Sequence, residues 1–246
     1  MQCVILAGGL GTRMWPEARS VPKTLIPVAG RPFAAWQLSW LARSGITSVL
    51  YCIGHLGSHV SGYVGDGSHW GLAVGYVDEG DQLRGTAGAL RLAYDEGRLA
   101  EDFLVLYGDS WLQVDPALVL RTARRRQALA LMTVYRNDGR WDASNVVLRG
   151  AQVVQYAKGL ADPPPDMGWI DYGLLAFRRE VIADRVPPNG AADLAPLCSQ
   201  LASAGMLSGL EVTQRFYEIG SPAGRTELEE LLAAEPGGDS PHTGQS

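Results

Sequence analysis

A glycine-rich turn near the start of the chain has the residue types of a phosphate-binding site. The apolar run Val4 to Ala7 leads into the turn, and Arg13 lies at its end. Glycines let the backbone take positive φ, so that successive N–H groups can point at phosphate oxygens. Arg13 and Lys23 supply the positive charge that backbone amides lack. We therefore expect Arg13 and Lys23 to be catalytic cations at a nucleotide site whose turn consists of Leu6, Ala7, Gly8, Gly9, Leu10, Gly11 and Thr12.

Other interpretations of this turn are weaker. A tight strand-to-helix turn needs glycine for steric reasons alone. The dinucleotide fingerprint GxGxxG lacks its third glycine, because Met14 stands there, and the GK[ST] end of a P-loop is missing. The segment Pro22-Lys23 places a second cation just after the turn. Two cations around one glycine turn fit a triphosphate better than a dinucleotide.

Asp109 is the candidate metal ligand. It follows the apolar run Leu104 to Tyr107 and Gly108 directly. Ligands of open α/β sheets bind beyond the carboxyl ends of the strands, and Mg²⁺ prefers carboxylate and phosphate oxygens. The alternative is a turn aspartate that caps the next segment. We expect Asp109 to bind Mg²⁺ and Gly108 to lie beside the nucleotide.

A polar loop and a predicted helix form the candidate base site. The loop begins at Glu79 and leads into the small residues Gly85 and Thr86. Small residues let a flat base lie against the backbone, and a helix N-terminus favours anionic ligands; close helix packing is the alternative. Glu79 or Asp81 suits the N–H donors of guanine.

The pattern of apolar segments predicts an α/β fold. Strand-like runs alternate with helical patterns in the first half, which indicates a Rossmann-like, three-layer architecture with a mostly parallel central sheet covered on both faces. The expected strands are 2–6, 48–53, 73–77, 103–107 and 129–135, and the expected helices are 32–44, 85–94, 193–204 and 223–233. After about residue 140 the apolar segments become shorter, at 145–148, 153–156, 172–177 and 215–219, which indicates a small mixed-strand lid.

We expect a single domain over residues 1–235, composed of a nucleotide-binding half, 1–140, and a second half with closing helices, 141–235. Residues 236–246 are rich in Gly, Pro and Ser and are typical of a disordered tail.

Composition excludes several classes of protein. The 246-residue chain carries a net charge of −5, which argues against a nucleic-acid surface. No apolar run approaches the roughly 20 residues of a membrane span, and the N-terminus lacks the pattern of a signal peptide, so we expect a cytoplasmic protein. Cys3, Cys52 and Cys198 form no CxxC pair and are expected to be buried hydrophobes. Trp36 and Trp40 leave a homo-oligomer interface possible, although core packing is the simpler use.

Four motifs together resemble one family. The stretches LAGGLGTRM, VPKTLIPVAGRP, GTAGA and EIGSP occur in that order and cover most of the chain. They resemble the sugar-1-phosphate nucleotidyltransferases, and most closely the guanylyltransferases among them. The resemblance implies a nucleotide-diphospho-sugar transferase fold whose second half binds the sugar. Trp15, where a smaller residue is expected, is a departure.

The resemblance also assigns further site residues. Asp109 is the metal-binding aspartate of the family, and Glu218 stands where many relatives carry a second aspartate. Lys158 aligns with the lysine on the sugar phosphate, although Ala157 replaces the glutamate that usually precedes it. The residues at positions where relatives contact sugar hydroxyls are Asn145, Asp171, Tyr172 and Gly173.

These residues predict transfer of a nucleoside monophosphate from an NTP to a sugar 1-phosphate, with Mg²⁺ as cofactor and pyrophosphate as leaving group. GTP is favoured, and a heptose- or mannose-type sugar for surface polysaccharide is implied by resemblance alone. One alternative is a UTP- or dTTP-dependent enzyme, since relatives that use a pyrimidine tend to have a glutamine near the position of Gln82. Another is a catalytically silent nucleotide-sugar-binding subunit, which Arg13, Lys23 and Asp109 together disfavour. A dinucleotide oxidoreductase is opposed by the missing third glycine.

Overall fold

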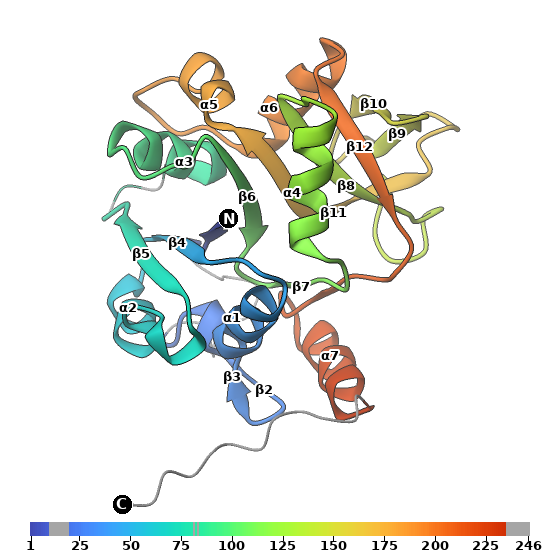
Figure 1. The fold of residues 1–246 in the computed structure, drawn as a ribbon. Helices are drawn as coiled ribbons and strands as arrows, with labels where there is room; N and C mark the ends of the chain where they lie inside the picture. Colours follow the sequence, from blue (N-terminus) through green and yellow to red (C-terminus); the bar gives the residue numbers. More distant parts are fainter. Residues whose placement is uncertain (10–19, 81, 83, 235–246) are drawn as a thin grey trace, which may run out of the picture.

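One mixed sheet forms the centre of the protein. The structure is a computed structural model that describes residues 1–9, 20–80, 82 and 84–234. Within these residues the main sheet has nine strands in the order β5-β4-β1-β6-β11-β8-β12-β10-β9 (Figure 1). The first four run parallel to one another, as expected for the first half of the chain. Their bounds are Ala73–Asp78 (β5), Ser48–Ile53 (β4), Gln2–Leu6 (β1) and Asp102–Tyr107 (β6).

The other five strands form a closed ring. β11 runs antiparallel to β6 and β8, and β12 is parallel to β8. β10 is antiparallel to β12 and β9, and β9 returns to β11 through Val146 and Trp169. The mixed strands are therefore a continuation of the central sheet and not a separate layer. Their bounds are Trp169–Arg178 (β11), Ala130–Arg136 (β8), Leu207–Val212 (β12), Gln152–Tyr156 (β10) and Val146–Arg149 (β9).

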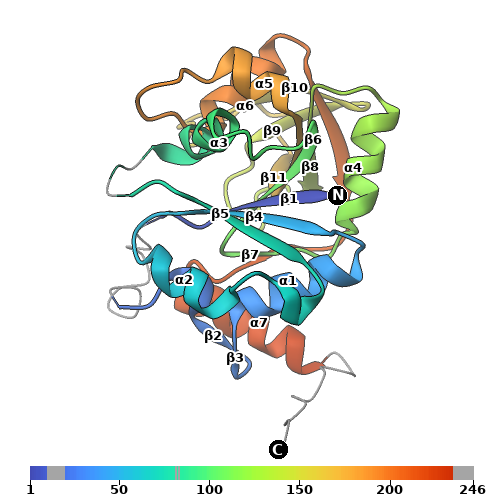
Figure 2. The same ribbon diagram turned by 60° about the vertical axis from the view of Figure 1, so that its left-hand side comes forward.

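Helices cover both faces of the sheet. Successive strand residues point to opposite faces, so Ile5 belongs to one core cluster and its neighbour Val4 to the other. Figure 2 shows α1, α2 and α7 on one side of the sheet and α3, α5 and α6 on the other. The three-layer arrangement is therefore as expected, whereas the prediction of a mostly parallel sheet is wrong, because antiparallel pairings join β6 to β11 and run through most of the ring. The helices are α1 (Phe33–Arg43), α2 (Gly57–Val64), α3 (Gly85–Asp95), α4 (Pro116–Arg125), α5 (Arg179–Arg185), α6 (Leu194–Ser203) and α7 (Pro222–Ala234).

Short elements complete the connections. The strand expected at 215–219 is reduced to two residues, β13, which pairs antiparallel with β7. A 3₁₀ turn, η3, carries Lys23 and is followed by the small hairpin β2–β3. The bounds are η3 (Lys23–Leu25), β2 (Pro27–Val28), β3 (Arg31–Pro32), η4 (Ser68–Trp70), β7 (Ser110–Trp111) and β13 (Tyr217–Glu218).

The buried residues agree with several sequence predictions. All three cysteines are free and buried, and burial raises the pKa of each thiol, which suits small hydrophobes. Trp40 is 9% exposed and packs in the core beside Trp111. No helix in the described part of the chain is long and apolar enough to cross a membrane. The tail at 236–246 lies beyond the described residues.

Candidate active site

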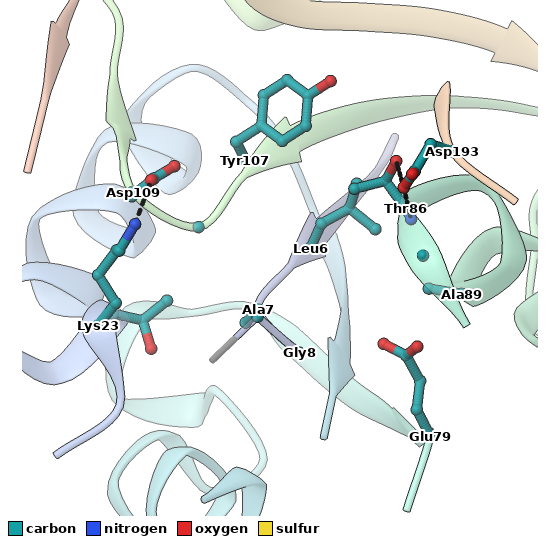
Figure 3. Close-up of a pocket in the computed structure, with 14 residues that line it drawn as sticks. Leu6, Ala7, Gly8, Lys23, Glu79, Thr86, Ala89, Tyr107, Asp109 and Asp193 are labelled. Carbon is teal, nitrogen blue, oxygen red and sulfur yellow. Dashed lines mark hydrogen bonds and ion pairs between the residues drawn. The ribbon is translucent and has the colours of Figure 1, made fainter. Parts of the chain in front are cut away.

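A cavity of about 450 Å³ opens at the carboxyl ends of β1 and β6, where the sequence predicts ligands to bind (Figure 3). Its walls come from six places: the ends of β1, β5 and β6, the η3 turn, the start of α3, and the segment before α6. The lining residues are Leu6, Ala7, Gly8, Gly9, Lys23, Thr24, Glu79, Gly85, Thr86, Ala89, Tyr107, Gly108, Asp109 and Asp193.

Lys23 and Asp109 form an ion pair on one side of the cavity. Lys23 Nζ lies 2.8 Å from Asp109 Oδ2, and the two side chains are 17% and 21% exposed. Gly108 N donates to Leu6 O at 3.0 Å, which fixes the tip of β6 against β1. A Cβ at Gly108 would lie 2.8 Å from both Leu6 O and Thr24 Cγ2, so this close approach needs glycine. The predicted cation and the predicted metal ligand therefore share one cavity.

Glu79 packs against the glycine turn. A Cβ at Gly8 would collide with Glu79 Oε1, so glycine is what allows the carboxylate to approach the end of β1. Glu79 Oε2 accepts a hydrogen bond from Arg84 N at 3.2 Å, which holds the side chain in place. Burial raises the pKa of Glu79, because desolvation disfavours the charged form.

The start of α3 differs from the expectation that it would offer free N–H groups to an anion. Thr86 N donates to Asp193 Oδ1 at 3.0 Å. Ala87 N and Gly88 N both donate to Ala192 O, at 2.8 and 2.9 Å. The segment before α6 therefore already accepts hydrogen bonds from these three N–H groups of the first turn. They are not available to bind an anionic ligand, and the start of α3 only forms part of the cavity wall.

Asp193 is a cavity residue that sequence reasoning missed. It directly precedes α6, where an aspartate is typical of a cap for its own helix. Its side chain instead caps α3, more than 100 residues earlier in the chain. No local pattern in the sequence indicates this contact. Thr24, Ala89 and Tyr107 are the other lining residues outside the prediction.

The predicted sugar-phosphate residues gather around Asp171, whose side chain is 3% exposed. Lys158 Nζ lies 3.7 Å from Asp171 Oδ2, and the same oxygen accepts from the Tyr156 hydroxyl at 3.1 Å. Gly173 N donates to Asp171 Oδ1 at 3.0 Å, and Asp171 N donates to Asn145 Oδ1 at 2.9 Å. Lys158, Asp171, Asn145 and Gly173 therefore form one hydrogen-bonded group.

This group lies beside the cavity but outside its lining. Lys158 Nζ is 5.8 Å from the ring centroid of Tyr107, which lines the cavity. Burial, with Asp171 nearby, raises the pKa of Tyr107 well above its usual value.

Tyr172 is 1% exposed and belongs to the core. Its hydroxyl accepts a hydrogen bond from Gln113 N at 3.0 Å and faces Arg215 O at 3.5 Å. Tyr172 therefore links core segments, and four of the five predicted residues stay together.

Glu218 is placed next to Asp109 by the backbone. It pairs in register with Ser110, and Ile219 N donates to Asp109 O at 2.9 Å. No group of three or more His, Cys, Asp or Glu side chains in the described ranges could hold a metal ion. Mg²⁺ is commonly held by one or two carboxylates plus substrate phosphates, so a pair of acids at this position fits it.

Some of the predicted site residues lie outside the part of the chain that the structure describes. Leu10, Gly11, Thr12 and Arg13 of the glycine turn lie outside the described residues, as do Trp15 and Asp81. The remaining predicted nucleotide residues all line the cavity, and they are Leu6, Ala7, Gly8, Gly9, Lys23, Glu79, Gly85, Thr86 and Gly108.

The fold and cavity define a three-layer α/β protein with a ligand site at the tips of its parallel strands. Residues 2–141 match the protein family described as Nucleotidyl transferase. Mannose-1-phosphate guanylyltransferase of Mycobacterium tuberculosis is 34% identical over 76% of this chain and 51% of its own length. N-acetylmuramate alpha-1-phosphate uridylyltransferase of Neisseria meningitidis is 27% identical over 95% of this chain and 99% of its own. The chain belongs to the Nucleotidyl transferase family of sugar-1-phosphate nucleotidyltransferases.

Solved structures share the fold. A candidate glucose-1-phosphate thymidylyltransferase from Bacillus anthracis, in complex with sucrose, superposes with a TM-score of 0.84 at 20% identity, covering 97% of this chain and 98% of its own. HddC from Yersinia pseudotuberculosis, complexed with GMP-PN, gives 0.77 at 21% identity, with 94% and 99% covered. The chain spans about half the length of the guanylyltransferase that it matches.

Proposed function

We propose that the protein transfers a nucleoside monophosphate from an NTP to a sugar 1-phosphate. The observation that carries the proposal is the Lys23–Asp109 pair on the same cavity as the glycine turn. A phosphate oxygen of the sugar 1-phosphate bonds to the α-phosphorus, and the bond from that phosphorus to the bridging oxygen breaks. Pyrophosphate leaves with the electron pair. The attacking oxygen is already anionic, so no protein base is needed.

The residues act by positioning and by neutralising charge. Lys23 faces the α-phosphate, and Lys158 faces the incoming sugar phosphate from the Asp171 group. Arg13, as proposed from the sequence, binds the leaving pyrophosphate. Asp109 and Glu218 would hold Mg²⁺, which when bound screens the negative charge of the phosphates. Residues 1–140 form the nucleotide half in this proposal, and residues 141–235 form the sugar half.

GTP is the nucleotide that we propose. Glu79 supplies a carboxylate acceptor on the cavity wall, which suits the N1–H and N2–H₂ donors of guanine. Gln82, the residue that would favour a pyrimidine, is exposed and is not among the lining residues. The mannose-1-phosphate guanylyltransferase relative supports the same choice, together with a mannose-type sugar. A heptose-type sugar and a role in surface polysaccharide are proposed from the sequence resemblance alone.

A UTP-dependent reaction is the second candidate. The uridylyltransferase of Neisseria meningitidis matches 95% of this chain and 99% of its own length, whereas the match to the guanylyltransferase covers 76% of this chain and 51% of that protein. A catalytically silent subunit has no use for a phosphate-binding cation, Lys23, paired with a metal ligand, Asp109.

A panel assay tests these proposals. Purified protein is incubated with GTP, UTP, dTTP, CTP or ATP and with several sugar 1-phosphates, and released pyrophosphate is measured with Mg²⁺ and with EDTA. We expect release only when a sugar 1-phosphate is present, with GTP best and EDTA abolishing it. Release without sugar phosphate, or none with any pair, would refute the transferase, and a preference for UTP would refute the base assignment alone.

A further inference from the structure

The hydrogen bonds of Thr86 leave it unable to donate to a ligand. Its backbone N and its Oγ1 both donate to Asp193 Oδ1, at 3.0 and 3.1 Å. The same Oγ1 accepts from Leu194 N at 2.8 Å. Gly85 permits this arrangement, because a Cβ there would lie 2.5 Å from Ala192 O. Thr86 therefore lines the cavity with both of its donors already used.

Asp193 keeps one carboxylate oxygen for other partners. Both hydrogen bonds from Thr86 end on Oδ1, and no described residue donates to Oδ2. The residue is exposed and lines the cavity, with Glu79 as the other carboxylate on that side (Figure 3). A carboxylate oxygen only accepts hydrogen bonds, so this wall calls for a ligand group that donates.

The position of Asp193 in the cavity favours contact with the nucleoside part of an NTP over contact with its phosphates. Figure 3 shows Lys23 and Asp109 on one side of the cavity and Thr86 with Asp193 on the other, with Leu6 and Ala7 between them. Phosphates are attracted to Lys23 and repelled by the carboxylate of Asp193. The lining residues on this side with Asp193 are the uncharged Leu6, Thr86 and Ala89, together with the carboxylate of Glu79.

We propose that Asp193 is a nucleoside-binding residue. Its Oδ1 fixes the start of α3 through Thr86, and its Oδ2 accepts a hydrogen bond from a donor of the bound nucleoside. A guanine nucleotide has two sources of that donor, the N1–H and N2–H₂ edge of the base and the ribose hydroxyls. The inference rests on the proposed function and adds a specificity-determining residue to it.

The variant Asp193→Asn tests this role. Its carboxamide oxygen still accepts from Thr86, while an NH₂ group replaces Oδ2 and reverses the polarity toward the cavity. We expect kcat/KM for GTP to fall about 10- to 100-fold, because a charged acceptor is replaced by a donor. The KM of the sugar 1-phosphate and the Tm stay close to those of the wild type. Asp193→Ser, which can still cap α3, is the second variant if the first folds poorly.

Nucleotide analogues identify the donor. ITP lacks the 2-amino group of guanine, and dGTP lacks the 2′-hydroxyl. We expect one of them to lose about tenfold in kcat/KM with the wild type, and that loss to disappear in Asp193→Asn. If the loss of kcat/KM with ITP is absent in Asp193→Asn, Asp193 contacts the base. If the loss with dGTP is absent instead, Asp193 contacts the ribose. Asp184→Asn, an exposed aspartate on α5, is the matched control and should behave as wild type.

Two failures can be told apart. If Asp193→Asn leaves kcat/KM for GTP and both analogue ratios unchanged, Asp193 only fastens α3 and the inference is wrong. If the wild type turns over no NTP, the proposed function fails, and the inference is then decided by the Kd of GTP from titration calorimetry. We then expect the Kd values to show the same differences between wild type and Asp193→Asn, and between GTP and its analogues, as kcat/KM would. Equal Kd values for the two proteins would overturn the inference.

Discussion

Replacing Asp109 by Asn separates the catalytic role of this carboxylate from its structural one. The substitution removes the negative charge 2.8 Å from Lys23 Nζ but keeps an oxygen that can accept a hydrogen bond from it. We expect a large loss of turnover and a small loss of stability. The two effects are measured separately, as kcat/KM from pyrophosphate release and as Tm from thermal unfolding.

The size of each effect follows from the geometry of the ion pair. At an effective dielectric constant of about 20, two unit charges this close attract by roughly 4 to 6 kcal/mol, and desolvation offsets most of that. Because the side chains are 17% and 21% exposed and Asn retains an acceptor, the free energy of unfolding should fall by about 1 to 2 kcal/mol. That corresponds to a Tm lower by about 2 to 8 °C. The loss of preorganised charge should lower kcat/KM about 10³-fold, or about 4 kcal/mol.

Two results would contradict this reasoning. If the purified Asp109→Asn protein turned over at the wild-type rate, Asp109 would have no part in the chemistry. If instead its Tm fell below the assay temperature, the loss of activity would only report unfolding. Asp184→Asn serves again as the control, since it removes one exposed carboxylate without touching the cavity.

Three further variants probe other parts of the site. Gly8→Ala should raise the KM of the NTP about tenfold, because the new Cβ displaces Glu79, whereas Gly62→Ala, at an exposed helix position with open space around it, should leave kinetics unchanged. Lys158→Met should raise the KM of the sugar 1-phosphate about 10- to 100-fold while that of the NTP stays constant, and an equal rise in both would contradict its placement. Burial raises the pKa of Glu79 above 4.5, so its contribution to stability is present below the unfolded-state pKa and is lost as the pH rises through the higher folded-state value. The Tm of Glu79→Gln relative to wild type should therefore increase as the pH rises through the acidic range; a constant difference would refute the shift.

The strand tips could be predicted from sequence because their signals are local. An apolar run followed by glycine and a charged residue predicts both a buried strand and what stands at its end. Leu6 and Gly108 are adjacent in the structure because β1 and β6 are neighbouring parallel strands. Lys23 and Asp109 then meet at the same edge of the sheet. The family resemblance adds the sugar-phosphate group, and the structure assembles three of its residues, Lys158, Asn145 and Gly173, around the buried Asp171.

The contacts that sequence reasoning missed are long-range ones. Asp193 reaches Thr86 across 107 positions, and only the packing of α6 against α3 brings them together. Tyr172 follows a strand pattern that does not reveal which face it occupies, and its ring lies in the core. The expected lid is joined to the central sheet because β11, in the second half of the chain, pairs with β6 and β8 of the first half and with β9 of the second. Apolar segments alone do not specify this topology.

The closed ring of five strands, β8 to β12, also limits how copies of this protein can associate through their sheets. A strand at the end of a sheet exposes unpaired N–H and C=O groups that invite another strand, but at β9 the pairing of Val146 with Trp169 of β11 interrupts such a row. Within the described residues, β5 is the remaining margin of the main sheet. Part of that margin is covered, since Val74 N donates to Asp66 O. Within the described part of the main sheet, the outer edge of β5 is therefore a partly blocked starting point for strand-to-strand association.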